Sequence, residues 1–174
     1  MDWYQTVFEL IDTRSFSNMW YWIALAVLWS TVSHWVLGVP FDMVQRAQRQ
    51  GGQAEADLED LVRVNINRIL YIQEYAGLFI LGFGCAAYTT LALLGFFYGV
   101  EFAQAVFLLA FPMMVIALMS LNTARRIRSD GLAGADLRKR MARHRFWTQV
   151  LGVVSIFVTA VFGMFQNVVV TGPL

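Results

Sequence analysis

Four long apolar segments alternate with polar ones along the chain, and none of the four contains an Asp, Glu, Lys or Arg residue. They cover residues 19–39, 75–100, 102–123 and 146–174. A helix needs roughly 20 apolar residues to cross about 30 Å of hydrocarbon. The pattern therefore predicts an all-α integral membrane protein, a single membrane domain over residues 1–174. Its four transmembrane helices are expected at residues 19–39, 75–98, 102–122 and 147–170.

The first residues have a different, amphipathic pattern. At 100° per residue, the aromatic and aliphatic side chains of residues 2–13 fall within one arc of about 160°, and polar side chains fill the rest. Residues 1–14 are therefore expected to form a helix in the outer membrane interface, either as a lipid anchor or as a docking helix for a partner subunit. The stretch 15–18 (SFSN) that follows supplies capping residues for the first membrane helix.

The polar segment 40–68 is predicted to form a cytoplasmic helical hairpin. Residues 41–50 are expected to continue the first membrane helix until Gly51 and Gly52 break it. The next helix is predicted to run unbroken over about residues 54–98. Its first turns carry acidic residues, which the positive end of the helix dipole favours.

Positive charge is distributed unevenly over the polar segments. Twelve of the thirteen Lys and Arg residues lie within residues 40–68 and 123–146, whereas the turn at 99–101 has none. Positively charged loops resist translocation across a membrane. Both segments are therefore expected in the cytoplasm, with the two chain termini in the periplasm.

The segment 123–146 is predicted to be a basic cytoplasmic loop with a break at Asp130 and Gly131 and a basic helix after the break. Such a segment attracts anionic lipid headgroups, by about 1 kcal/mol for each basic residue near the membrane surface. Nucleic-acid binding is not expected, because the membrane topology alone accounts for the charge. The residues predicted to contact headgroups are Arg125, Arg126, Arg128, Arg138, Lys139 and Arg140.

Composition agrees with this fold class. Hydrophobic residues make up 58% of the chain and charged residues only 14%, whereas soluble proteins are about 25% charged. The single cysteine, Cys85, excludes an intrachain disulfide and a cysteine-based zinc site. Because the chain is so rich in apolar residues and so poor in charged ones, the lipid bilayer is the first partner that the sequence predicts.

Small residues recur at helical spacing in three of the predicted spans. Because lipid gives no hydrophobic drive for helix association, such residues mark faces where helices pack closely. The helices at 75–98 and 102–122 are expected to form an antiparallel hairpin in this way, so that a large side chain at Gly84 would push them apart. The residues predicted to lie at helix contacts are Gly77, Gly84, Ala103, Ala110, Ala117, Gly152, Ser155, Thr159 and Gly163.

Three ionisable residues near the predicted cytoplasmic interface, His34, Glu74 and His144, are candidates for a cofactor site. In the favoured interpretation, His34 is neutral, faces the bundle interior and hydrogen-bonds Ser30, Glu74 or a carbonyl group, while His144 is solvated. In the other interpretation, the histidines ligate a haem or a metal ion. Ionisable groups within a membrane are candidates for function because burying their charge is costly.

No catalytic pattern is present in the sequence. The middle of each apolar run has no Asp, Glu, Lys or Arg residue that could form a proton or ion path. The stretch 82–87 (GFGCAA) matches a dinucleotide-binding fingerprint nominally, but that fingerprint requires a preceding strand. The sequence therefore favours a non-enzymatic accessory or assembly subunit without a cofactor or metal, packed against other membrane subunits or itself. The alternative is a small haem- or quinone-associated redox subunit that uses His34.

Residues 1–44, 51–70 (GGQAEADLEDLVRVNINRIL) and 101–109 (EFAQAVFLL) resemble a group of uncharacterised inner-membrane proteins of alphaproteobacteria. The resemblance covers most of the chain and implies a location in the bacterial inner membrane. Those proteins often carry the label "component of SufBCD complex", which implies a link to iron–sulfur cluster assembly. Cys85 alone could not hold such a cluster, because a cluster normally takes four ligands.

Overall fold

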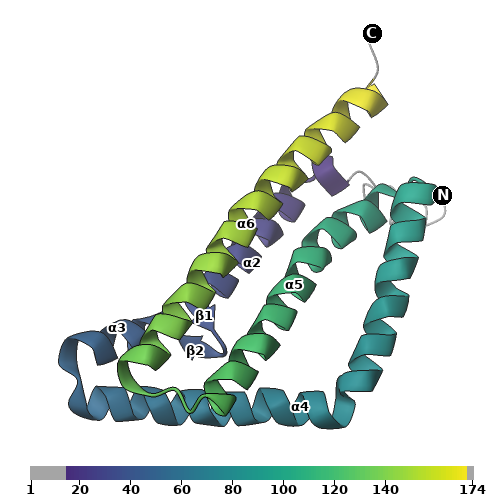
Figure 1. Cartoon of the computed structure of the whole chain (residues 1–174). Coiled ribbons are helices and arrows are strands. Elements are labelled where there is room, and N and C mark those ends of the chain that lie inside the picture. The colour runs from purple at the N-terminus through teal and green to yellow at the C-terminus, as the bar shows by residue number, and fades with distance from the viewer. Residues whose placement is uncertain (1–14, 172–174) are drawn as a thin grey trace, which may run out of the picture.

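The computed structural model describes residues 15–171, which form an almost entirely helical chain (Figure 1). The all-α class is therefore confirmed, while the amphipathic helix predicted at residues 1–14 lies outside the described residues. The elements are η1 (Ser15–Ser17), α2 (Met19–His34), β1 (Trp35–Val36), β2 (Val39–Pro40), α3 (Phe41–Gln50), α4 (Gly52–Ala92), the π-helix η2 (Leu93–Phe97), α5 (Glu101–Ser129) and α6 (Gly134–Thr171).

Three helical stretches are long and apolar enough to cross a membrane, and they contain the second, third and fourth predicted spans. They are Gly52–Phe97, Glu101–Ser129 and Gly134–Val168. The first predicted span corresponds to α2, which has only 16 residues. At 1.5 Å per residue this helix is about 24 Å long, shorter than the hydrocarbon core. Asn18 caps it as predicted, because its side-chain oxygen accepts a hydrogen bond from the backbone N–H of Trp20 at 3.0 Å.

The prediction that residues 41–50 continue the first membrane helix is wrong. α2 ends at His34, and the chain reverses through the short antiparallel pair of β1 and β2. Leu37 and Gly38, with φ values of 53° and 75°, form the turn between them, and left-handed residues in such a turn match the twist of a hairpin. Pro40 occupies the N-cap position of α3, and proline disfavours a helical conformation for Val39 before it, so the helix begins after Pro40.

α4 and η2 form one continuous helical stretch, as predicted for residues 54–98, but this stretch is sharply bent. Figure 1 shows that α4 turns about half-way along its length. Its first half lies across the lower end of the other helices, and its second half runs upward toward the start of α5. The bend coincides with a change in composition, because all charged residues of α4 lie within residues 52–74.

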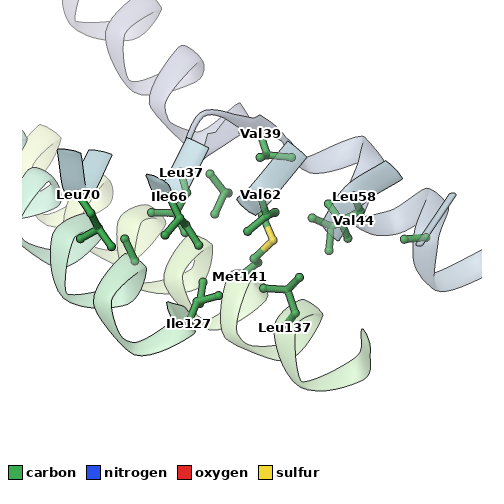
Figure 2. Close-up of a cluster of buried hydrophobic side chains, with 13 residues drawn as sticks. Leu37, Val39, Val44, Leu58, Val62, Ile66, Leu70, Ile127, Leu137 and Met141 are labelled. Carbon is green, nitrogen blue, oxygen red and sulfur yellow. The ribbon is translucent and has the colours of Figure 1, made fainter. Parts of the chain in front are cut away.

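The largest buried cluster lies at the lower end of the molecule and joins both polar segments (Figure 2). Val39 of the hairpin, Val44 of α3 and Val62 of α4 meet Ile127 of α5 and Met141 of α6 there, and all five are buried. The two segments predicted as separate cytoplasmic elements therefore form one packed layer. The break predicted at Asp130 and Gly131 is confirmed, since α5 ends and α6 begins on either side of it.

At the opposite end, buried and half-buried polar side chains connect several helices. Nε2 of Gln104 donates to the carbonyl oxygen of Gly95 in η2 at 2.7 Å, and its Oε1 accepts from Nε2 of Gln166 in α6 at 2.7 Å. The Glu101 carboxylate accepts the backbone N–H of Phe16 at 2.8 Å. These bonds hold η1 and the last turns of α6 at the same end of the molecule (Figure 1).

The small-residue face predicted for the last helix lies against α2 and η1. A methyl group added to Gly152 would lie 2.8 Å from the Trp29 ring, and one added to Gly163 would lie 3.1 Å from a ring in η1. Ser155 and Thr159 are buried on the same helix. Only residues without large side chains allow α2 to approach α6 this closely.

The packing role predicted for Gly77 and Gly84 is wrong within this chain. A methyl group added to Gly84 would meet no atom within 4 Å, and one added to Gly77 would meet only Gln73 of its own helix. The bend in α4 explains this difference, because the second half of the helix diverges from α5 after the bend and approaches it again only near η2 (Figure 1).

The small residues of α5 have mixed surroundings. Ala103 is buried and Ala110 is half-buried, whereas Ala117 is exposed, so the packing role predicted for Ala117 is wrong. A larger side chain of α4 reaches α5 instead: the Tyr88 hydroxyl donates to the carbonyl oxygen of Ala110 at 2.8 Å.

Candidate functional site

A basic cavity of about 230 Å³ lies between the end of α5 and the start of α6. From α5 it is lined by Met119, Asn122, Thr123 and Arg126, and from α6 by Arg140, Arg143, His144 and Trp147. In each helix the four residues have the spacing i, i+3, i+4 and i+7, which places them on one helical face. The cavity therefore forms where two helix faces meet.

His144 is a buried polar member of this cavity, only 6% exposed, and it precedes the uncharged stretch of α6. Its Nε2 lies 3.3 Å from the Ser120 hydroxyl oxygen, and its Nδ1 lies 3.2 Å from that of Thr123. Burial, and to a lesser extent the charge of Arg140, lower the pKa of His144 from its usual 6.5, because both disfavour the charged ring. The prediction that His144 is solvated is therefore wrong.

The three arginines of the cavity are not neutralised by the protein. Within residues 15–171, Arg126, Arg140 and Arg143 form no ion pair, and the cavity lining contains no Asp or Glu. The Nε atom of Arg140 is buried and has no hydrogen-bond partner in that part of the chain. Three guanidinium groups around one hollow concentrate positive potential there.

Of the residues predicted to contact lipid headgroups, three bind other side chains of the protein instead. The pairs are Arg125 with Gln73, Arg138 with Glu55 and Lys139 with Asp136. Arg128 is exposed near the end of α5. The structure thus brings only Arg126 and Arg140 of the predicted set together, and it adds Arg143, which the sequence pattern did not single out.

Two carboxylates of α4 hold the start of α6 and so position one wall of the cavity. Oε1 of Glu59 accepts the backbone N–H of Gly134 at 2.7 Å, and Glu55 forms an ion pair with Arg138 one turn later. A carboxylate at a helix N-terminus is stabilising, because free N–H groups and the helix dipole both favour negative charge there. The sequence predicts that these acidic residues stabilise the N-terminus of their own helix, α4. In the structure, their side chains reach the N-terminus of α6 instead.

His34 and Glu74 are not brought into a common site with His144. The His34 ring is exposed at the end of α2, in edge contact with the Trp35 ring at a centroid distance of 6.0 Å. Glu74 is exposed on α4. The prediction that His34 faces the bundle interior is therefore wrong, because α2 ends at this residue. The redox alternative uses His34, and the structure places this ring apart from Glu74 and His144.

No group of three or more His, Cys, Asp and Glu side chains that could hold a metal ion occurs within residues 15–171. No protein-family model, no curated protein and no solved structure matches this chain. The contacts and charges of the chain itself are therefore the basis for a functional proposal.

Proposed function

We propose that this chain is a non-enzymatic accessory or assembly subunit of the bacterial inner membrane. It packs through the second half of α4 against another membrane protein or a second copy of itself. The observation that carries the proposal is the exposure of this segment. In the most apolar 18-residue window of Gly52–Phe97, 0% of the residues are buried within the chain, against 28% in α5 and in α6.

The residues on the uncovered half of α4 support a protein neighbour. Gly77 and Gly84 lie one heptad apart there, and a methyl group added to either would meet no atom of another helix within 4 Å. Lipid tails give no hydrophobic drive for helix association, so small residues in a membrane helix are enriched where a second backbone approaches. Leu78 and Phe79, 84% and 85% exposed, add a large apolar surface beside them.

In this proposal α2 is a fourth membrane-crossing helix, which puts both chain termini in the periplasm. Its exposed side chains include Ile23 and Val27, and Trp20 and Trp35 near its two ends suit the depth of the lipid headgroups. A helix shorter than the hydrocarbon core is accommodated by local thinning of the bilayer at modest cost. The backbone of the following hairpin is not left to lipid, because Val39 and its neighbours are buried in the core.

The test of the packing proposal is the size of the complex extracted from membranes in a mild detergent. Gly84→Leu places a large side chain in the open space beside Gly84, so we expect it to shift the chain from a larger complex to its isolated size. Ala160→Leu is the matched control, because Ala160 is also a small residue but is exposed on α6. This control is expected to leave the complex intact.

The melting temperature of the purified chain separates a lost partner from a damaged fold. We expect Gly84→Leu to melt as the wild type does, since a Cβ atom added at Gly84 would meet no atom within 4 Å. A Gly84→Leu complex of unchanged size would contradict the proposal. Crosslinking from position 79 then distinguishes a second copy of the chain from a different subunit.

A further inference from the structure

We propose that the basic cavity between α5 and α6 is a discrete binding site for one phosphate group, supplied by the headgroup of an anionic phospholipid. This goes beyond the general attraction of a basic surface to lipid, because it assigns the ligand to one hollow and to three side chains. It depends on the proposed membrane topology only for the source of the phosphate.

The first argument is the set of free donors. Arg126, Arg140 and Arg143 face one cavity without an ion pair among the described residues. A guanidinium group presents its N–H donors in a planar fork that matches two phosphate oxygens, and such charge-assisted hydrogen bonds are among the strongest in proteins. Three like charges that line one hollow repel each other, and an anion bound between them would remove that repulsion.

The second argument is the contrast with nearby basic residues on the same helix. Arg138 pairs with Glu55, while the Arg145 Nε donates to the carbonyl oxygen of Ser33 at 3.2 Å and its guanidinium lies 3.9 Å from the centre of the Phe41 ring. These two arginines hold α6 against α4, α2 and α3. Arg140 and Arg143 lie between them in the sequence and have no such structural role, so they are available for a ligand.

The third argument is the size of the cavity and the change from charged to apolar residues along its lining. The cavity volume of about 230 Å³ is several times the roughly 30 Å³ that one water occupies in the liquid, so a tetrahedral phosphate has room. Asn122 adds an amide beside the arginines, whereas Met119 and Trp147 are apolar. Trp147 lies at the start of the uncharged stretch of α6. A lining that changes from cationic to apolar matches a lipid phosphate with its acyl chains.

The experiment measures lipid retention by native mass spectrometry of the purified full chain in detergent, with phosphatidylglycerol or phosphatidylcholine added. We expect saturable binding of one phosphatidylglycerol per chain and no comparable binding of phosphatidylcholine. Arg143→Gln, at an exposed position that does not hold the fold, should weaken the affinity about tenfold or more, since it removes a charge-assisted bond. Arg140→Gln should have a similar effect.

The matched control is Arg49→Gln with Arg68→Gln, which removes equal or greater positive charge at exposed arginines outside the cavity. Diffuse attraction would weaken binding for every arginine removed, by about 1 kcal/mol or roughly fivefold each. The proposed site predicts an unchanged affinity in the control. Equal losses in the control and cavity variants, or none in Arg143→Gln, would overturn the proposal.

Inorganic phosphate alone identifies the source of the ligand. If phosphate does not raise the melting temperature of the chain while phosphatidylglycerol does, the phospholipid is the ligand. If phosphate alone raises it and Arg143→Gln abolishes the effect, the site holds a soluble phosphate compound, which supports the phosphate site and rejects the lipid as its source. If neither compound raises the melting temperature in an Arg143-dependent way, no such site exists.

Discussion

The His144 ring is held between two hydroxyl groups of α5 and faces a cavity with three arginines. A neutral imidazole has one donor and one acceptor, and a hydroxyl group can complement either of them. The charged ring gains no carboxylate partner there, since no Asp or Glu lines the cavity. Arg140 also repels it, so the folded state favours the neutral form.

This preference predicts a pH dependence of stability. The pKa of His144 is lowered in the folded chain, whereas in the unfolded chain the ring has an ordinary value of about 6.5. The unfolded state therefore binds more protons once the pH falls toward and below about 6.5, and stability is lost as the pH falls. We expect the melting temperature in detergent to drop between about pH 8 and about pH 5.

His144→Gln keeps a donor and an acceptor but does not titrate, so its melting temperature should depend less on pH than that of the wild type. His34→Gln, at an exposed ring, is the control and should retain the wild-type dependence. The same pH profile for wild type and His144→Gln would mean that His144 contributes nothing to it.

The two histidines show which part of the site could be predicted from the sequence. His34 lies in an apolar run and His144 in a basic one, so average composition assigns the first to the interior and the second to solvent. The structure reverses both, because burial follows the helical face. Leu137, Met141, His144 and Thr148 are all buried and lie four, three and four residues apart, a periodicity that the sequence does contain. The end of α2 at His34 depends on the hairpin that follows, and no local pattern indicates how that hairpin packs.

At the scale of elements, apolar runs predict which segments form membrane-length helices better than they predict which helices pack against each other. The runs at 75–98, 102–122 and 147–170 all lie in membrane-length helices. The bend of α4 was not predicted, since no proline interrupts that helix. Each face of an uncharged helix can contact either lipid or another helix. The small residues of α4 alone therefore could not show that no other helix of the chain packs closely against them.

Two glycines in membrane helices provide a matched test of helix contact. We expect Gly152→Ala to destabilise the purified chain by about 1–3 kcal/mol, because the new methyl group would lie 2.8 Å from the Trp29 ring in a packed contact. Gly84→Ala meets no atom within 4 Å and should be neutral or stabilising by up to about 1 kcal/mol, since alanine is the better helix former. Thermal unfolding in one detergent compares them. Equal changes in stability for the two variants would mean that α2 and α6 lie farther apart than the structure shows.

At the scale of the whole molecule, the buried core joins segments that lie on either side of two membrane-length helices in the sequence. Val62 and Leu58 of α4 pack with Ile127, Leu137 and Met141 of α5 and α6 (Figure 2). In the proposed membrane topology, this packing puts the segments 40–68 and 123–146 on the same side of the membrane. Those same segments carry twelve of the thirteen basic residues, as that topology requires.

The number of crossings decides where each terminus lies, and α2 is the element on which this depends. With four crossings, reporter fusions after Leu174, before Met1 and in the turn at 98–100 should all behave as periplasmic, and fusions at Gly52 or Gly134 as cytoplasmic. If α2 does not cross, only the fusion before Met1 changes and becomes cytoplasmic. If the fusion after Leu174 is cytoplasmic, the charge argument itself fails, because the segments with the basic residues would then face the periplasm.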